Sequence, residues 1–110
     1  MGVDVVLKQV NQPGTSPKRR RLTQVDAVLD GSDLFARICE NSDLPELNRV
    51  DPYGTLILTG QDMPQFIFEV DTVRRTWTQG APERDLLDAI RRLAERCAED
   101  VSLELHLEGD

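Results

Sequence analysis

The sequence predicts an α+β fold in which one small antiparallel or mixed sheet has helices packed on one face. Apolar residues alternate with polar ones near both ends of the chain, which is the pattern of a half-buried strand. Between these ends, over residues 86–97, apolar residues recur at helical spacing. A chain of 110 residues has room for one core, so we expect a single domain over residues 1–110.

The N-terminal third predicts two strands joined by a long loop. Apolar residues alternate over 3–8 and again over 25–29. Residues 11–21 contain two proline-centred turn signals and end in a run of four basic residues, which predicts a flexible basic loop. A solvated loop is the default interpretation of that run, and electrostatic docking to an acidic partner is the second.

A short helix and a short strand are predicted in the middle of the chain. Ser32 is a suitable N-cap for a helix over 33–41. An irregular stretch follows, over 44–50. Residues 56–58 then predict a short strand that ends at Gly60.

The tetrapeptide Asp51-Pro52-Tyr53-Gly54 predicts a tight turn before that strand. Pro52 fixes φ, Gly54 tolerates a positive φ, and the Asp51 carboxylate can accept a hydrogen bond from the backbone of its own turn. Such a turn displays Tyr53 within an acid-rich part of the chain.

The segment after the short strand fits two templates. Residues 66–70 alternate as a strand does, but the apolar spacing over 63–78 fits a helix across a longer window. Asp62 followed by Gln65 has the pattern of a capping box, in which each side chain bonds the other residue's backbone. We therefore expect a helix over about 63–78, capped by Asp62.

The last quarter predicts a helix and a terminal strand. Pro82 opens the helix, which runs to about Glu99, with acidic residues in its first half and arginines in its second, as the helix dipole favours. Residues 101–107 alternate as a strand with one polar face. Because the two terminal strands have the cleanest alternation, we expect them to lie next to each other in the sheet.

The chain is acidic, with a formal net charge of −7. Repulsion from phosphates argues against a nucleic-acid partner, whereas a basic protein partner is compatible with this charge. The alternative is that the charge only keeps the domain soluble. No apolar run reaches the ~18 residues of a membrane span, and the N-terminus lacks a secretory pattern, so we expect a cytoplasmic protein without a membrane partner.

Two cysteines, Cys39 and Cys97, fall on apolar helix faces and predict buried thiols in a reducing compartment. A single bridge between them is the open alternative.

No catalytic signature is present. The chain lacks a phosphate-binding glycine loop, a serine nucleophile elbow and a His-Glu zinc pair. Its only histidine, His106, lies on the polar face of a predicted strand. The acidic cluster Glu83, Asp85 and Asp88 is explained by its place in the first half of a helix. We expect no enzyme activity, no cofactor and no metal. The less favoured alternative is an enzyme of unrecognised type, with a site assembled from scattered residues.

The tight turn, together with four other segments, carries a resemblance that covers most of the chain except 11–48. These segments are the strand over 3–8, Gln61-Asp62-Met63-Pro64-Gln65-Phe66, a leucine-rich helix with Arg96-Cys97, and Leu107-Glu108-Gly109-Asp110. In these segments the chain resembles a largely uncharacterised family of small bacterial proteins. Thr55 departs from the pattern, which often has an acidic residue after the turn glycine. The resemblance implies a bacterial, cytoplasmic, single-domain protein and supplies no activity.

Charge and turn together favour a protein-binding module. The specific hypothesis is an immunity or antitoxin-type protein whose acidic surface neutralises a basic toxin or enzyme domain. Tyr53 is predicted either to anchor this interface or to cover the helix that begins at Met63. The alternative function is a small structural or adaptor subunit that oligomerises through a sheet edge or the helix over 86–97. The residues expected to contact a partner are Asp43, Glu46, Asp51, Tyr53, Asp62, Glu69 and Asp71.

Overall fold

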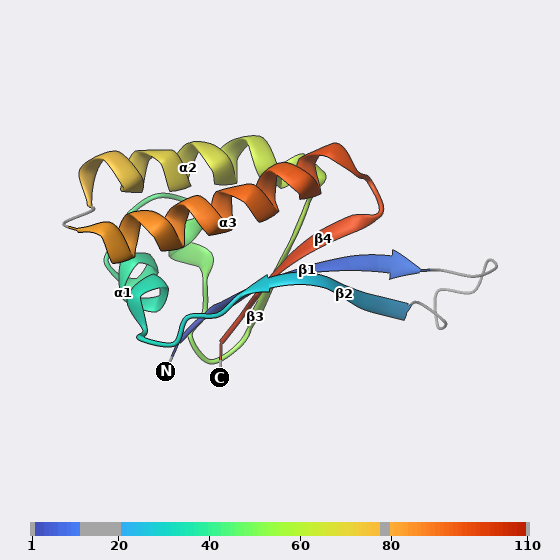
Figure 1. The fold of residues 1–110 in the computed structure, drawn as a ribbon, viewed down its shortest axis with the longest axis horizontal. Coiled ribbons are helices and arrows are strands. Elements are labelled where there is room, and N and C mark those ends of the chain that lie inside the picture. The colour runs from blue at the N-terminus through green and yellow to red at the C-terminus, as the bar shows by residue number, and fades with distance from the viewer. Residues whose placement is uncertain (1, 12–20, 78–79, 110) are drawn as a thin grey trace.

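The computed structural model describes residues 2–11, 21–77 and 80–109 and has the predicted α+β fold (Figure 1). Its strands are β1 (Asp4–Asn11), β2 (Arg21–Val28), β3 (Thr55–Thr59) and β4 (Leu103–Glu108). Its helices are α1 (Leu34–Glu40), α2 (Met63–Thr76) and α3 (Ala81–Glu99), with the 3-10 turns η2 (Leu47–Arg49) and η3 (Gly60–Asp62).

The sheet is fully antiparallel in the order β2-β1-β4-β3. The predicted adjacency of the terminal strands is confirmed, because Val5 pairs with Leu107 in the centre of the sheet. The predicted hairpin is also confirmed, although β1 and β2 both extend further than the alternation indicated. Residues 12–20, the larger part of the predicted basic loop, lie outside the described residues.

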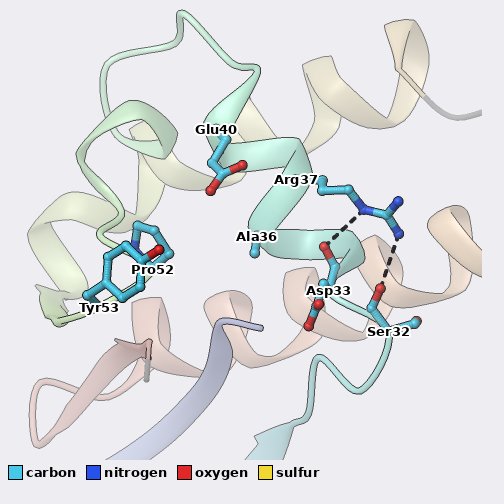
Figure 2. A pocket seen from close by; sticks show the side chains of 7 residues that line it. All are labelled: Ser32, Asp33, Ala36, Arg37, Glu40, Pro52 and Tyr53. Atoms are coloured by element: carbon cyan, nitrogen blue, oxygen red, sulfur yellow. Dashed lines mark hydrogen bonds between the residues drawn. The ribbon is translucent and has the colours of Figure 1, made fainter. Parts of the chain in front are cut away.

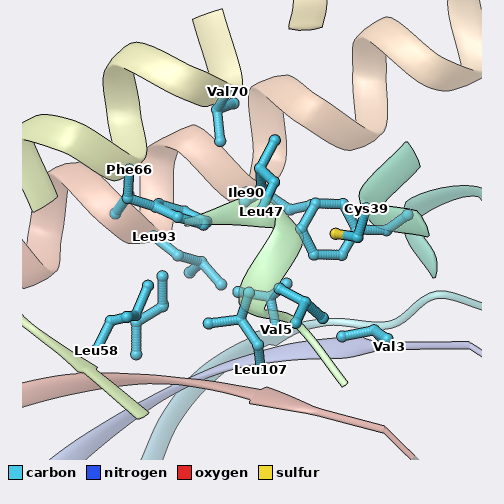
Figure 3. Close-up of a cluster of buried hydrophobic side chains, with 14 of the residues drawn as sticks. Val3, Val5, Cys39, Leu47, Leu58, Phe66, Val70, Ile90, Leu93 and Leu107 are labelled. Atoms are coloured by element: carbon cyan, nitrogen blue, oxygen red, sulfur yellow. The ribbon is translucent and has the colours of Figure 1, made fainter. Parts of the chain in front are cut away.

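Helices α2 and α3 lie side by side over one face of the sheet, and α1 closes the end of the core nearest the two termini (Figure 1). Figure 3 shows Phe66 from α2 and Leu93 from α3 directed toward Leu107 of β4. The helical interpretation of 63–78 is therefore right over Met63–Thr76, and residue 78 lies outside the described part. The alternation over 66–70 misleads because Phe68 is an exposed residue of the helix.

Ser32 as the cap of α1 is wrong. Asp33 adopts a left-handed conformation, with φ of 61°, and the first N–H groups of α1 then face the buried carboxylate of Asp30. Asp30 accepts hydrogen bonds from the backbone N–H groups of Phe35 at 3.0 Å and Ala36 at 2.9 Å. It also accepts one from the Val3 N–H at 3.0 Å, so the same carboxylate ties α1 to the start of β1.

The predicted capping box of Asp62 and Gln65 is also wrong, since the box forms one turn earlier. Asp62 closes it with Thr59 at the start of η3, where its carboxylate accepts a 2.9 Å hydrogen bond from the Thr59 N–H. Gln65 instead donates from Nε2 to Glu69 Oε2 at 2.6 Å. The 3-10 turn, which the sequence pattern did not indicate, shifts the start of the helical segment toward Thr59.

Candidate functional site

The tight turn is held from two sides. The Asp51 carboxylate accepts a 2.8 Å hydrogen bond from the Tyr53 N–H, and the Gly54 N–H donates to the Asp51 carbonyl at 3.2 Å. From the end of the sheet, the Gly109 N–H donates to the Gly54 carbonyl at 2.7 Å. These bonds fix the backbone on both sides of Tyr53, whose side chain is 71% exposed.

Gly109 packs directly against the turn. A Cβ atom at this position would lie 2.3 Å from the carbonyl carbon and oxygen of Pro52, closer than any side chain can approach. Only glycine fits there without moving the backbone. The turn and the glycine near the C-terminal end, two of the sequence segments that carry the resemblance, are thus one structural unit.

Helix α1 faces this turn across a surface groove of about 390 Å³, which we call the Tyr53 groove (Figure 2). Residues 36, 37 and 40 have the spacing of one face of a helix, and Asp33 directly precedes α1, so the helix lines the groove along its length with two charged side chains, Arg37 and Glu40. The groove is lined by Ser32, Asp33, Ala36, Arg37, Glu40, Pro52 and Tyr53.

Arg37 and Glu40, the two charged residues that α1 contributes to the groove, differ in their contacts within the protein. Arg37 donates from its guanidinium to the backbone carbonyl oxygens of Ser32 at 3.1 Å and Asp33 at 3.4 Å (Figure 2). Glu40 forms no ion pair with any residue among 2–11, 21–77 and 80–109. The groove therefore combines an exposed aromatic ring with a carboxylate that is available to an incoming cation.

Of the seven residues expected to contact a partner, only Tyr53 lines this groove. Its ring is exposed and does not cover α2, so that alternative is wrong. Asp51 is exposed, and its carboxylate holds the turn by accepting the hydrogen bond from the Tyr53 N–H. Asp43 is exposed at a second, smaller pocket of about 150 Å³ beside Trp77.

Three other expected contact residues serve internal interactions. Glu46 pairs with Arg49 at 3.1 Å, and Asp62 closes the box of η3. Asp71 accepts a 2.7 Å hydrogen bond from Arg91 and links α2 to α3. Their charges are already engaged, so they are poorer candidates for a partner's cations.

Glu69 was expected at the surface, and its side chain is fully buried, with 0% exposure. Its carboxylate accepts hydrogen bonds from the backbone N–H groups of Glu46 and Leu47, each at 2.9 Å, and from Gln65. It holds η2 against α2 and is not available to a partner. The sequence pattern could not indicate this, since the backbone N–H groups that Glu69 accepts from are more than twenty residues away along the chain.

The residues that the sequence interpretation missed are Asp33 and Glu40. A signal for them was present, because positions 33, 37 and 40 of a short helix fall on the face opposite Ile38, which is buried. What the sequence could not show is that the Tyr53 turn packs opposite that face.

His106 alternates along β4 with the core residues Leu105 and Leu107, so it lies on the opposite face of the sheet, where it is buried. Its Nε2 lies 3.1 Å from Glu104 Oε1. Val6 of β1 pairs with His106 of β4, and Lys8 and Glu108 lie two residues away on the same face. Lys8 and Glu108 form a 2.8 Å ion pair, so their side chains cross over Val6 and His106. This arrangement is a covered polar cluster of the sheet. Within the described ranges, no group of three or more His, Cys, Asp or Glu side chains is placed to hold a metal ion.

Both cysteines are free and buried, as the sequence predicted. Burial raises the pKa of the Cys97 thiol to about 11, and nearby Glu104 adds to this effect. Burial, followed by the charge of Asp30, raises the pKa of Cys39 even further. The folded state therefore disfavours both thiolates, and this part of its stability is lost only as the pH rises above the ordinary thiol value of 9.0.

Both thiols are expected to be inert to a thiol-reactive disulfide reagent in the native protein near neutral pH, because only the thiolate attacks and both sulfurs are buried. The reaction releases a chromophore from the reagent, and its absorbance follows the rate. We expect the native protein to react at least about a hundredfold more slowly than the protein unfolded in denaturant. Either thiol reacting natively at the rate of the unfolded chain would contradict this assignment.

None of the helices in the described part of the chain is both long enough and apolar enough to span a membrane. No protein-family model, curated protein or solved structure matches this chain.

Proposed function

We propose that this chain is a cytoplasmic protein-binding module that binds a basic segment of a partner in the Tyr53 groove. The observation that carries the proposal is an exposed tyrosine, on a turn fixed at both ends, facing a helix whose wall includes Asp33 and Glu40. Exposed tyrosines on fixed backbone are frequent anchors of protein interfaces, because they bury much surface at little entropic cost.

The chemistry of the groove suits a lysine or arginine side chain. A cation inserted between Tyr53 and Glu40 gains a carboxylate partner and contact with the face of an aromatic ring. Arg37 competes little for this carboxylate, since its guanidinium donates to two backbone carbonyls. The net charge of −7 would attract a basic partner from a distance and speed association.

This binding mode fits an immunity or antitoxin-type protein that blocks a basic toxin or enzyme domain. Such a protein inhibits by covering its target, so it needs an exposed anchor and complementary charge and no catalytic group of its own. The bacterial origin and the inhibitory role are parts of this proposal, supported by the resemblance in sequence and by the charge.

Tyr53→Ala and Glu40→Lys are expected to weaken binding to a basic partner by about ten- to a hundredfold, as the loss of an interface anchor does. Products of genes adjacent to this one are the first partners to test, by biolayer interferometry at several salt concentrations. Wild-type association should slow at least about tenfold between low and high salt.

Phe68→Ala is the matched control, because Phe68 is an exposed aromatic residue on α2, away from the groove. It should leave binding unchanged. If Phe68→Ala and Tyr53→Ala weaken binding equally, or if neither does, the Tyr53 groove is not the interface.

The second candidate function is a small structural or adaptor subunit. It is favoured by one specific observation, the outer edge of β3, which pairs with no strand in the described part of the chain.

A further inference from the structure

We propose that two copies of this chain associate through β3, which pairs with the β3 of the second copy to form one continuous antiparallel sheet. Strand β3 is an edge strand, with β4 as its only strand neighbour in the described part of the chain. The central residue of β3, Ile57, lies on the helix-free face of the sheet and is 46% exposed. An exposed edge strand offers unpaired backbone groups to another strand.

The two edge strands of the sheet, β2 and β3, differ in how well they are protected against pairing with a strand of another molecule. On β2, the register with β1 shifts between Leu7 and Lys8, which leaves Val25 as an unpaired bulge, and charged Arg21 and Asp26 line the strand. Bulges and charges are the devices that prevent edge-to-edge pairing. Strand β3 has no bulge, charged residue or proline over Thr55–Thr59, and the one charge at its free edge is the Asp62 carboxylate that caps the Thr59 N–H at the end of the strand.

The sequence of β3 reads the same in both directions. From Gly54 to Gly60 it is Gly-Thr-Leu-Ile-Leu-Thr-Gly. Antiparallel pairing with a second copy about a two-fold axis at Ile57 therefore places Ile57 beside Ile57, Leu56 beside Leu58, and Thr55 beside Thr59. A two-fold interface requires a surface that complements itself, and this strand meets that requirement residue by residue.

The backbone groups needed for this register point outward. Gly54 accepts a hydrogen bond from the Gly109 N–H on the β4 side, and pairing alternates along an antiparallel strand. The N–H and C=O of Thr55 and Ile57 therefore face the free edge. The Thr59 N–H also points away from β4, since it donates to Asp62 at 2.9 Å.

In the dimer each Ile57 N–H donates to the Ile57 C=O of the other copy, and each Thr55 N–H donates to the other copy's Thr59 C=O. The Thr59 N–H keeps its bond to Asp62, so no donor is left without a partner by this register. The two Ile57 side chains lie together on the helix-free face and exclude water from each other.

A five-residue strand buries little surface, which places this dimer among weak and concentration-dependent associations. Each copy carries a net charge of −7, so the copies repel at low ionic strength and salt should strengthen the dimer. Binding of a basic partner in the Tyr53 groove has the opposite salt dependence, so the two proposals can fail independently.

Sedimentation equilibrium of the full chain at rising concentration and salt tests the proposal. The average mass is expected to rise from the 12.4 kDa of one chain toward twice that value. Ile57→Lys should raise the dimer dissociation constant at least about tenfold, because two like charges would then lie directly opposite each other. Leu22→Lys is the matched control: Leu22 is 43% exposed on the helix-free face of β2, and this change should leave the dimer intact.

A cysteine variant tests the register itself and does not depend on tolerance of a lysine. Ile57→Cys should form an intermolecular disulfide under mild oxidation, because directly opposed residues lie about 5.5 Å apart at Cα, within reach of a disulfide. Thr55→Cys lies opposite Thr59 of the other copy and should not cross-link. A monomer at millimolar concentration, equal losses in the two lysine variants, or equal cross-linking by the two cysteine variants would overturn the proposal.

Discussion

The Glu69→Ala variant is expected to lose about 3–5 kcal/mol of unfolding free energy, which is a large part of the stability of a small domain. The reason is the position of the carboxylate, which is fully buried and accepts hydrogen bonds from the N–H groups of Glu46 and Leu47 and from Gln65. Alanine leaves these donors without a partner and leaves a cavity between η2 and α2. Urea unfolding followed by circular dichroism measures the loss.

Glu69→Gln should cost far less, about 1 kcal/mol. One oxygen of the new amide can accept from both backbone N–H groups, as Glu69 Oε1 does in the wild type. The NH₂ group then meets Gln65, whose own amide can rotate to offer its oxygen, and the change loses only the second, shared contact of Oε2 with the Glu46 N–H at 3.0 Å. Glu95→Ala is the control, since Glu95 forms an exposed ion pair with Arg91 and should contribute less than about 0.5 kcal/mol. Equal losses for alanine at 69 and 95 would refute the role of Glu69.

The Asp30→Ala variant is expected to lose about 3–4 kcal/mol, because three backbone N–H groups then lose their acceptor. These groups belong to Val3, Phe35 and Ala36, so the change loosens α1 from β1 as well as uncapping the helix. Hydrogen exchange at the Phe35 and Ala36 amides should accelerate more than exchange in β4.

Asparagine should rescue Asp30 poorly, in contrast to glutamine at position 69. The two oxygens of Asp30 accept from different backbone N–H groups, Phe35 at Oδ1 and Val3 and Ala36 at Oδ2, so the amide NH₂ displaces a separate donor whichever way it is turned. We expect Asp30→Asn to retain less than half of the lost stability. Asp85→Ala, which removes an exposed carboxylate from α3, should be nearly neutral. If Asp30→Asn is as stable as the wild type, the three-donor arrangement is wrong.

Local patterns predicted the order and type of the helices and strands. The alternation over 3–8 and 101–107 and the helical spacing over 86–97 each report one buried face, and a buried face depends mainly on the segment's own period. The adjacency of the terminal strands followed from the same signal. The order β2-β1-β4-β3 and the 3-10 turn before α2 required contacts that no single segment contains.

The helix caps and the set of residues expected to contact a partner were predicted less well, for a common physical reason. Ser32 and Gln65 have the right chemistry at the right spacing, yet Asp30 and Thr59 cap instead, because the chain path decides which N–H groups point where. Glu69 looks like a surface residue until η2, distant in sequence, supplies its donors. Carboxylates satisfied by distant backbone cannot be distinguished from solvated ones by local sequence.

The position of β4 has a consequence for how the chain folds as it is synthesised. Strand β4 follows every other element along the chain, yet it lies between β1 and β3 in the sheet. While the earlier residues emerge from the ribosome, the β1–β2 hairpin and β3 have no strand to join them, and α2 and α3 have an incomplete surface to cover. The nascent chain must therefore keep its apolar helix faces exposed until residues 103–108 are released, a long-range requirement of the kind that slows folding and invites chaperone binding.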